Sequence, residues 1–146
     1  MKKVFTLLIF TALGFNTLIA KEIRSAEILF AKKCAMCHTV LKPKNKAAKK
    51  RMVAPPITKA MKSVVITIDA LEGPLKDDEL KEQTLVFLQD YIYNPSKKKA
   101  DCEGSVIKKF GVMPSLKGFI SQKELDVLLP WVYESFKPKK VNGEWP

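Results

Sequence analysis

The chain has too few cysteines and histidines for most structural metal or disulfide frameworks, with three cysteines and one histidine in 146 residues. Three thiols cannot pair completely, so the sequence excludes a disulfide-stapled fold. Acidic residues are also scarce, 15 against 26 lysines and arginines, and the formal charge is +11. Runs of lysine are usually solvated surface, but this excess also favours acidic partners over basic ones.

The apolar stretch near the amino terminus, residues 4–19, is too short to be a typical membrane span. It follows Lys2 and Lys3 and is closed by Ala20, an arrangement typical of a secretory signal peptide. Because a bilayer needs about 20 apolar residues, a cleaved signal is favoured over a retained anchor. We therefore expect residues 1–20 to be removed after Ala20, and export to a periplasm. A single domain, residues 21–146, with a charge of +9 would remain.

The segment Cys34-Ala35-Met36-Cys37-His38 carries the most specific pattern in the chain, and it contains the sole histidine. C-x-x-C-H is the attachment signature of a c-type haem. Each thiol can form a thioether with one vinyl group of the porphyrin, and the imidazole that follows can bind the iron. The sequence thus predicts one covalent haem, held by Cys34 and Cys37 and ligated by His38.

Two other chemistries use the same residue types. Thiol–disulfide exchange requires a C-x-x-C pair at the N-terminus of a helix in a βαβ setting, whereas here the pair follows a predicted helix. A zinc site made of Cys34, Cys37, His38 and Cys102 has suitable ligands. The adjacent Cys37 and His38, however, cannot easily occupy two corners of one tetrahedron. Both readings are therefore disfavoured.

The periodicity of apolar residues predicts a mostly helical, all-α chain. One helix is expected over residues 22–33, a second from Asp77 or Asp78 to about residue 93, and a short third one from an Asp101 cap to residue 110. The Ser121–Glu124 capping box should begin a last helix, which Pro130 should kink.

Two segments are less regular. Residues 42–51 hold six basic residues and no acid, which indicates a solvated loop with about one turn of helix. Residues 57–68 are ambiguous, because their β-branched residues favour a strand while Met61 and Val65 could face inward from a short helix.

A second iron ligand has one favoured candidate. Met113 precedes Pro114 in an irregular stretch 75 residues after His38, and a thioether raises the potential of haem iron. Most methionines merely fill gaps in a core, which is the competing reading. Met36, Met52 and Met61 are alternatives, but they lie within or close to the attachment motif.

Over most of its mature length the chain resembles the class I monohaem cytochromes c. The resemblance rests on features spread along the sequence: Phe30 four residues before Cys34, the Cys34–His38 motif, a proline at 55 or 56, the helix end at 91–95, Met113-Pro114, and an aromatic-bearing last helix. It implies the cytochrome c fold, four to five short helices around one haem c, with His38 and Met113 as axial ligands.

The same resemblance implies three further contacts. The first and last helices should cross, with Ala26 in the place of the usual glycine, packed against Trp131 or Tyr133. The carbonyl of Pro55 should accept a hydrogen bond from the imidazole of His38. Pro130 and the long segment 57–76 depart from the family pattern, the first at the helix crossing and the second at one edge of the haem site.

The expected function is that of a periplasmic electron carrier and not an enzyme. The alternative is a haem c subunit or sensor domain of a larger redox complex, with a weak or absent Met113 ligand. Expected partners are acidic proteins such as an oxidase, a reductase or a peroxidase, with no nucleic acid and at most peripheral membrane contact. A monomer is expected, although the odd Cys102 could link two chains.

Overall fold

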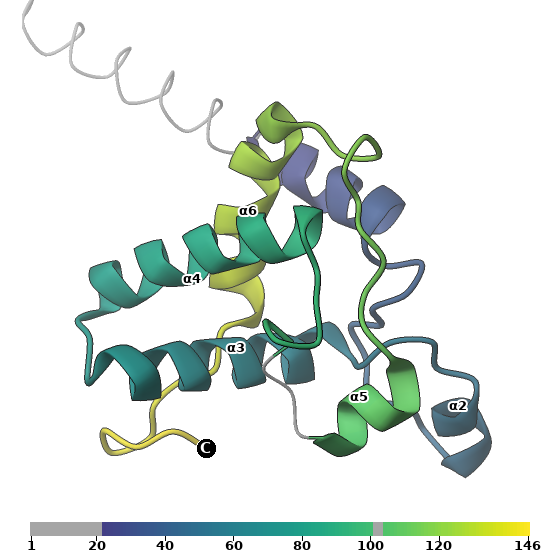
Figure 1. The fold of residues 1–146 in the computed structure, drawn as a ribbon, viewed down its shortest axis with the longest axis horizontal. Helices are drawn as coiled ribbons and strands as arrows, with labels where there is room; N and C mark the ends of the chain where they lie inside the picture. The colour runs from purple at the N-terminus through teal and green to yellow at the C-terminus, as the bar shows by residue number, and fades with distance from the viewer. Residues whose placement is uncertain (1–21, 101–103) are drawn as a thin grey trace, which may run out of the picture.

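The chain folds as a set of packed helices. The structure, a computed structural model, describes residues 22–100 and 104–146, so the expected signal peptide, Asp101 and Cys102 lie outside the described residues. Within the described ranges there are isolated bridges but no strands, which confirms the all-α class. Figure 1 shows a helix at residues 22–33 and, after it, the labelled helices. These are α2 (Lys46–Lys50), α3 (Ile57–Glu72), α4 (Asp77–Tyr93), α5 (Gly104–Phe110) and α6 (Gln122–Phe136).

The ambiguous segment after Pro56 is the 16-residue helix α3, so the strand alternative is wrong. Its β-branched residues are outweighed by an apolar stripe at helical spacing, in which Met61 and Val65 are both buried. The inward-facing arrangement of these two side chains is therefore confirmed, in a longer helix than expected.

The start of α4 differs by one residue from the prediction. Lys76 is the N-cap, and its N–H donates to Glu79 Oε2 at 3.2 Å. Asp77 and Asp78 lie inside the first turn instead of capping it. Their charges still favour this end of the helix, because the N-terminus of a helix carries a partial positive charge.

Helix α6 begins with the predicted capping box. Ser121 N–H donates to Glu124 Oε2 at 2.8 Å, and Glu124 N–H donates to Ser121 Oγ at 3.3 Å. Pro130 stands inside the helix, which continues through to Phe136. The missing N–H of a proline costs one helical hydrogen bond, and the burial of the apolar face of α6 offsets that cost.

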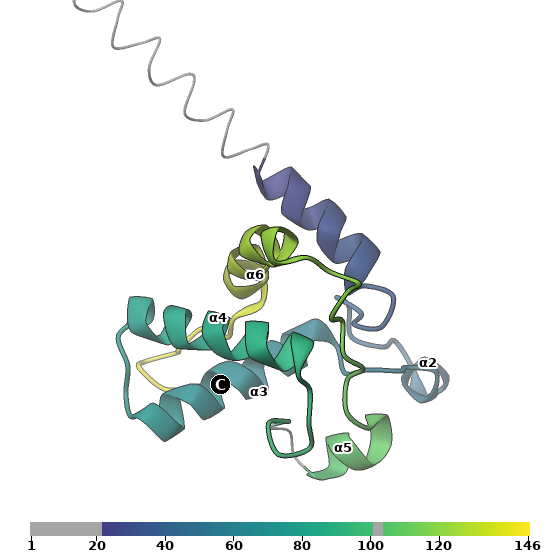
Figure 2. The same ribbon diagram turned by 45° about the horizontal axis from the view of Figure 1, so that its top comes forward.

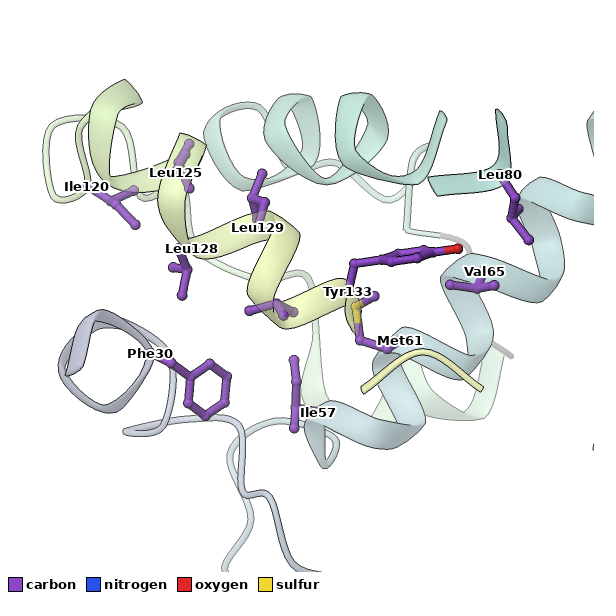
Figure 3. Packing of buried hydrophobic residues seen from close by; sticks show 11 residues of the cluster. Phe30, Ile57, Met61, Val65, Leu80, Ile120, Leu125, Leu128, Leu129 and Tyr133 are labelled. Atoms are coloured by element: carbon purple, nitrogen blue, oxygen red, sulfur yellow. The ribbon is translucent and has the colours of Figure 1, made fainter. Parts of the chain in front are cut away.

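Helices α3, α4 and α6 pack on one another and form the core. In Figure 3, Tyr133 of α6 extends toward Val65 and Leu80, while Leu128 faces Phe30 of the first helix. Leu125, Leu128 and Val65 are at most 1% exposed, so truncating any of them would open a cavity in the core.

The first helix joins this core through its last turns. The ring of Phe30 lies 5.5 Å from that of Trp131 and 5.3 Å from that of Phe136, and Ala26 is 1% exposed. Figure 2 shows the first helix beside the start of α6. Of the two aromatic residues expected at this contact, Trp131 meets the first helix, and Tyr133 belongs to the contact with α3 and α4.

The carboxyl-terminal segment is fastened to the end of α3 through one carboxylate. Asp69 accepts hydrogen bonds from Trp145 Nε1 at 2.7 Å and from Leu75 N–H at 3.1 Å, and Lys140 Nζ lies 3.3 Å away. Partial burial alone would raise the pKa of Asp69, but these three donors together hold it below its ordinary value.

Replacing this carboxylate should destabilise the protein in a pH-dependent way. We expect Asp69→Asn to lower the free energy of unfolding at pH 7 by about 1–2 kcal/mol, because the ion pair and the charge-assisted hydrogen bonds are lost. Because the pKa of Asp69 is lower in the folded state, its carboxylate stabilises the fold at pH values above the unfolded-state pKa of about 4. This contribution is lost as the pH falls through the folded-state pKa. Urea titrations should therefore show the difference at pH 7 and little difference near pH 2.

The matched control is Glu72→Gln, which removes an exposed carboxylate from the same helix. It should change stability by no more than about 0.5 kcal/mol. Equal effects of the two substitutions at pH 7, or an Asp69→Asn effect that persists unchanged in acid, would contradict the role assigned to Asp69.

Candidate functional site

The Cys34–His38 segment leaves the first helix through a tight hydrogen-bonded turn. Cys34 N–H donates to Phe30 O at 2.9 Å, Cys37 N–H to Cys34 O at 3.1 Å, and His38 N–H to Cys34 O at 2.9 Å. The motif therefore continues directly from the buried end of the helix, and Cys34 packs against the core. This local structure fixes the two thiols and the imidazole relative to one another.

The imidazole of His38 is oriented by a carbonyl 17 residues further on. His38 Nδ1 lies 2.9 Å from Pro55 O. Because a carbonyl can only accept, Nδ1 carries the proton and Nε2 keeps its lone pair. Burial lowers the pKa of His38, and the Pro55 carbonyl offsets part of this effect by favouring the protonated ring. The neutral ring with a free Nε2 is the form that binds a metal.

A second bond closes the same loop and positions this carbonyl. Ile57 N–H donates to Thr39 O at 2.9 Å, so the residue after His38 is joined to the residue two positions after Pro55. Pro55 and Pro56 each fix one backbone angle, and α3 begins directly after them. Of the two prolines, the structure therefore gives the contact with His38 to Pro55.

The two thiols differ in environment. Burial, together with the nearby Cys37, raises the pKa of Cys34 to about 11, while Cys37 is exposed. Thiol–disulfide exchange needs the opposite shift, because the attacking group is a thiolate. Among the described residues no three histidine, cysteine or acidic side chains gather as metal ligands, so that part of the chain offers no zinc site.

Met113 lies half-buried on a separate segment that is held at both ends. Gly111, at φ +73°, ends α5, and its N–H donates to Ile107 O. Beyond Met113, Leu116 N–H donates to Ile92 O at 3.0 Å, and Ser115 Oγ donates to the carbonyl oxygen of Tyr93 at 2.6 Å. Four of the five predicted residues thus lie in the Cys34–His38 turn or in the segment hydrogen-bonded to it, which holds Pro55. Met113 lies on another loop.

The other methionines have clearer environments. Met61 is 1% exposed inside the core, so it fills space between α3 and its neighbours. Met36 is 70% exposed within the attachment motif, and Met52 is half-buried beside the basic segment. Core packing therefore accounts for Met61, whereas Met113 has no such role in the buried cluster of the described residues.

Lys33 joins the Cys34–His38 segment to the loop before α6, a contact that no sequence pattern predicted. Lys33 donates from Nζ to Phe119 O, lies 4.3 Å from the centre of the Phe119 ring, and is 3.8 Å from Glu124. Its neighbour in sequence is Cys34. The segment that carries Met113 is thereby joined to the end of the first helix.

The surface around the motif is both apolar and basic. Met36, Val40, Leu41 and Val53 are between 45% and 76% exposed. The segment 42–51, which contains α2, lies between them in sequence and supplies six basic side chains. Figure 1 shows α5 next to α2, and Lys109 Nζ donates to Lys49 O at 3.0 Å across this contact.

Comparison with known proteins does not assign the chain to a family. No protein-family profile matches the chain, and no solved structure matches it. A protein of Aquifex aeolicus (strain VF5), described as uncharacterized, is 28% identical over 128 residues, which cover 80% of each chain. No described helix has the length and apolar character needed to cross a membrane.

Proposed function

We propose that the chain is an exported monohaem cytochrome c that carries single electrons, with His38 and Met113 as the axial ligands. The observation that supports this most is the 2.9 Å contact between His38 Nδ1 and Pro55 O. It supplies the tautomer that leaves Nε2 for iron, at the histidine that follows C-x-x-C.

The residues present fit a covalently attached haem. Within the described chain both thiols of the motif are free cysteines, and the only histidine presents an unprotonated nitrogen. When bound, haem c supplies an iron that gains or loses one electron. Cys34 and Cys37 would hold the porphyrin edge, His38 would ligate one face of the iron, and Met113 the other.

The proposed fold is that of the class I cytochromes c, within the all-α class. The contact of Phe30 with Trp131, and the buried Ala26, support a crossing of the first and last helices. The loop of Met113 is hydrogen-bonded to α5 on one side and to the end of α4 on the other. It would therefore keep its conformation, and the thioether its position, during electron transfer. Two ligands that stay in place leave no open position for a substrate, so we propose a carrier and not an enzyme.

The proposed partners are acidic redox proteins of the same extracytoplasmic compartment. Exposed apolar side chains near His38, flanked by the basic segment 42–51, suit a surface that attracts such a partner and then releases it. Electron transfer to a suitable oxidase, reductase or peroxidase should therefore slow as ionic strength rises.

The absorption spectrum of the purified, exported protein tests this proposal. A ferric sample should show the sulfur-to-iron charge-transfer band, and a ferrous sample should resist carbon monoxide at neutral pH. A covalent haem without that band, and with ready binding of carbon monoxide, would favour a sensor or a subunit of a larger complex. A protein without covalent haem would contradict the proposal altogether.

A further inference from the structure

A groove of about 690 Å³ lies along α3, and residues of α5 and of the end of α6 complete its lining. Its volume is within the range of small-molecule sites in proteins. Of the five predicted haem-site residues, Pro55 lines the groove and the other four do not. Pro55 contacts His38 at Nδ1, the nitrogen that does not bind iron in the proposed function, so the groove is separate from the proposed haem site.

Apolar side chains from three helices line this groove. Val106 of α5 is 9% exposed, and Ile66 of α3 and Phe136 of α6 are half-buried. Ile66 does not belong to the buried core cluster of the described residues, so its remaining surface is available to a ligand. An apolar chain placed against these three side chains would lose contact with water and gain affinity from that loss.

Four lysines line the same groove, and no aspartate or glutamate does. Two of them, Lys59 and Lys62, stand three residues apart on α3. This spacing places like charges on one side of a helix, which is unfavourable unless an anion offsets it. The carboxylate of Pro146 is the one negative group in the lining, so positive charge is in excess.

The lysines of the groove differ in how far they are engaged within the protein. Lys137 pairs with Glu134 at 2.7 Å and lies over the Tyr133 ring. Lys42 and Lys62, by contrast, form no hydrogen bond or ion pair with any residue of the described ranges. They come from different segments, a loop and helix α3, and both are exposed, so each is available to an anionic group.

An apolar surface bordered by unpaired cations matches a molecule that has an apolar chain and an anionic head group. We propose that the groove binds a small amphipathic anion, with its chain against Ile66, Val106 and Phe136 and its head group at Lys42 and Lys62. A membrane surface offers the same chemistry, but it is flat and does not enter a groove between helices, so the ligand is a free molecule. The site is independent of the proposed electron transfer, since it shares no iron ligand or haem-bound cysteine with it.

Calorimetric titration of the purified, exported protein with decanoate, below the critical micelle concentration, tests this inference. We expect saturable binding of one molecule per chain. Hexanoate has the same head group and a chain four methylene groups shorter, and it should bind about tenfold more weakly or worse, because each buried methylene group adds affinity. Decyltrimethylammonium has the same chain length and a positive head group, and it should show no saturable binding.

Charge variants locate the head group. Lys42→Gln and Lys62→Gln should each weaken decanoate binding about threefold, as expected for an ion pair at an exposed site, and the double variant about tenfold. Lys123→Gln removes the same charge from an exposed position on α6 outside the groove and should leave the affinity unchanged. The sulfur-to-iron band of the ferric protein should persist at saturation, since the groove is separate from the iron ligands.

The opposite results would overturn the inference. These are the absence of saturable decanoate binding, equal binding of the cationic amphiphile, or an unchanged affinity in the double variant. Loss of the sulfur-to-iron band at saturation would place decanoate at the iron and overturn it as well. Binding of anionic vesicles that the double variant weakens, without binding of monomeric decanoate, would assign the lysines to a membrane surface instead. A folded protein without covalent haem would contradict the proposed function alone, because the titration requires only the folded chain.

Discussion

The exported double variant Cys34→Ser/Cys37→Ser should contain no covalent haem. Both thioethers would be lost, and His38 alone would hold iron only reversibly. Haem staining after denaturing electrophoresis, together with the intact mass of the protein, measures this directly. We expect loss of essentially all attached haem, the largest effect of any substitution considered for this chain.

The same variant should fold poorly. Cys34 and Phe30 belong to the contact between the first helix and the core, so the haem attached there would complete the core on that side. A ligand that binds only the folded state stabilises it, and its absence removes that stabilisation. Rapid proteolysis and a weakened helical signal in circular dichroism are the expected results.

Cys102→Ser is the matched control, since it removes the third thiol and leaves the motif intact. It should retain haem and stability, and it should abolish any dimer that reducing agents dissociate. Haem that remains covalently bound in the double variant, or is lost in the control, would disprove the assignment of the two thiols.

Met113→Ala should open the iron without releasing the haem. Under the proposed function the covalent links and His38 would remain, so the variant should purify with haem but lack the sulfur-to-iron band, and its ferrous form should bind carbon monoxide. Loss of a thioether ligand lowers the reduction potential, by on the order of 100 mV or more within the roughly 0.8 V range set by axial ligands. Absorption spectra and potentiometry measure both effects.

Met36→Ala and Met52→Ala serve as controls, one at an exposed and one at a half-buried methionine near the motif. Both should keep the wild-type spectrum. Should Met52→Ala lose the band while Met113→Ala keeps it, the ligand would be Met52, and the loop after α5 would have no part in binding iron.

The sequence predicted the positions of the helices better than their exact ends and their packing partners. The strongest signals were local, such as the Ser121–Glu124 box and the apolar spacing of α4, and both correspond to helices in the structure. Residues 57–68 remained ambiguous because β-branched side chains favour strands, and only burial of Met61 and Val65 against other helices decides for α3.

The candidate site shows the same division. The pattern Cys34–His38 was visible in the sequence, and the contact of His38 with Pro55 followed only from a family resemblance. The roles of Lys33 and Asp69 could not be predicted, because their partners lie 86 and 76 residues away along the chain. A local sequence pattern does not indicate contacts between residues so far apart in the sequence. Lysines and aspartates are also common on protein surfaces, so their presence alone does not predict a role.

The fastening of the Met113 loop to α4 has a consequence for cooperativity. Leu116 and Ser115 bond to Ile92 and Tyr93, and Tyr93 in turn donates its hydroxyl to Ile120 O at 3.1 Å. Release of Met113 by opening of its loop would therefore break bonds to the last turn of α4, so the two segments form one unit of local unfolding. Under the proposed function, the lifetime of the iron–sulfur bond would depend on a helix end some 20 residues upstream, which touches neither atom.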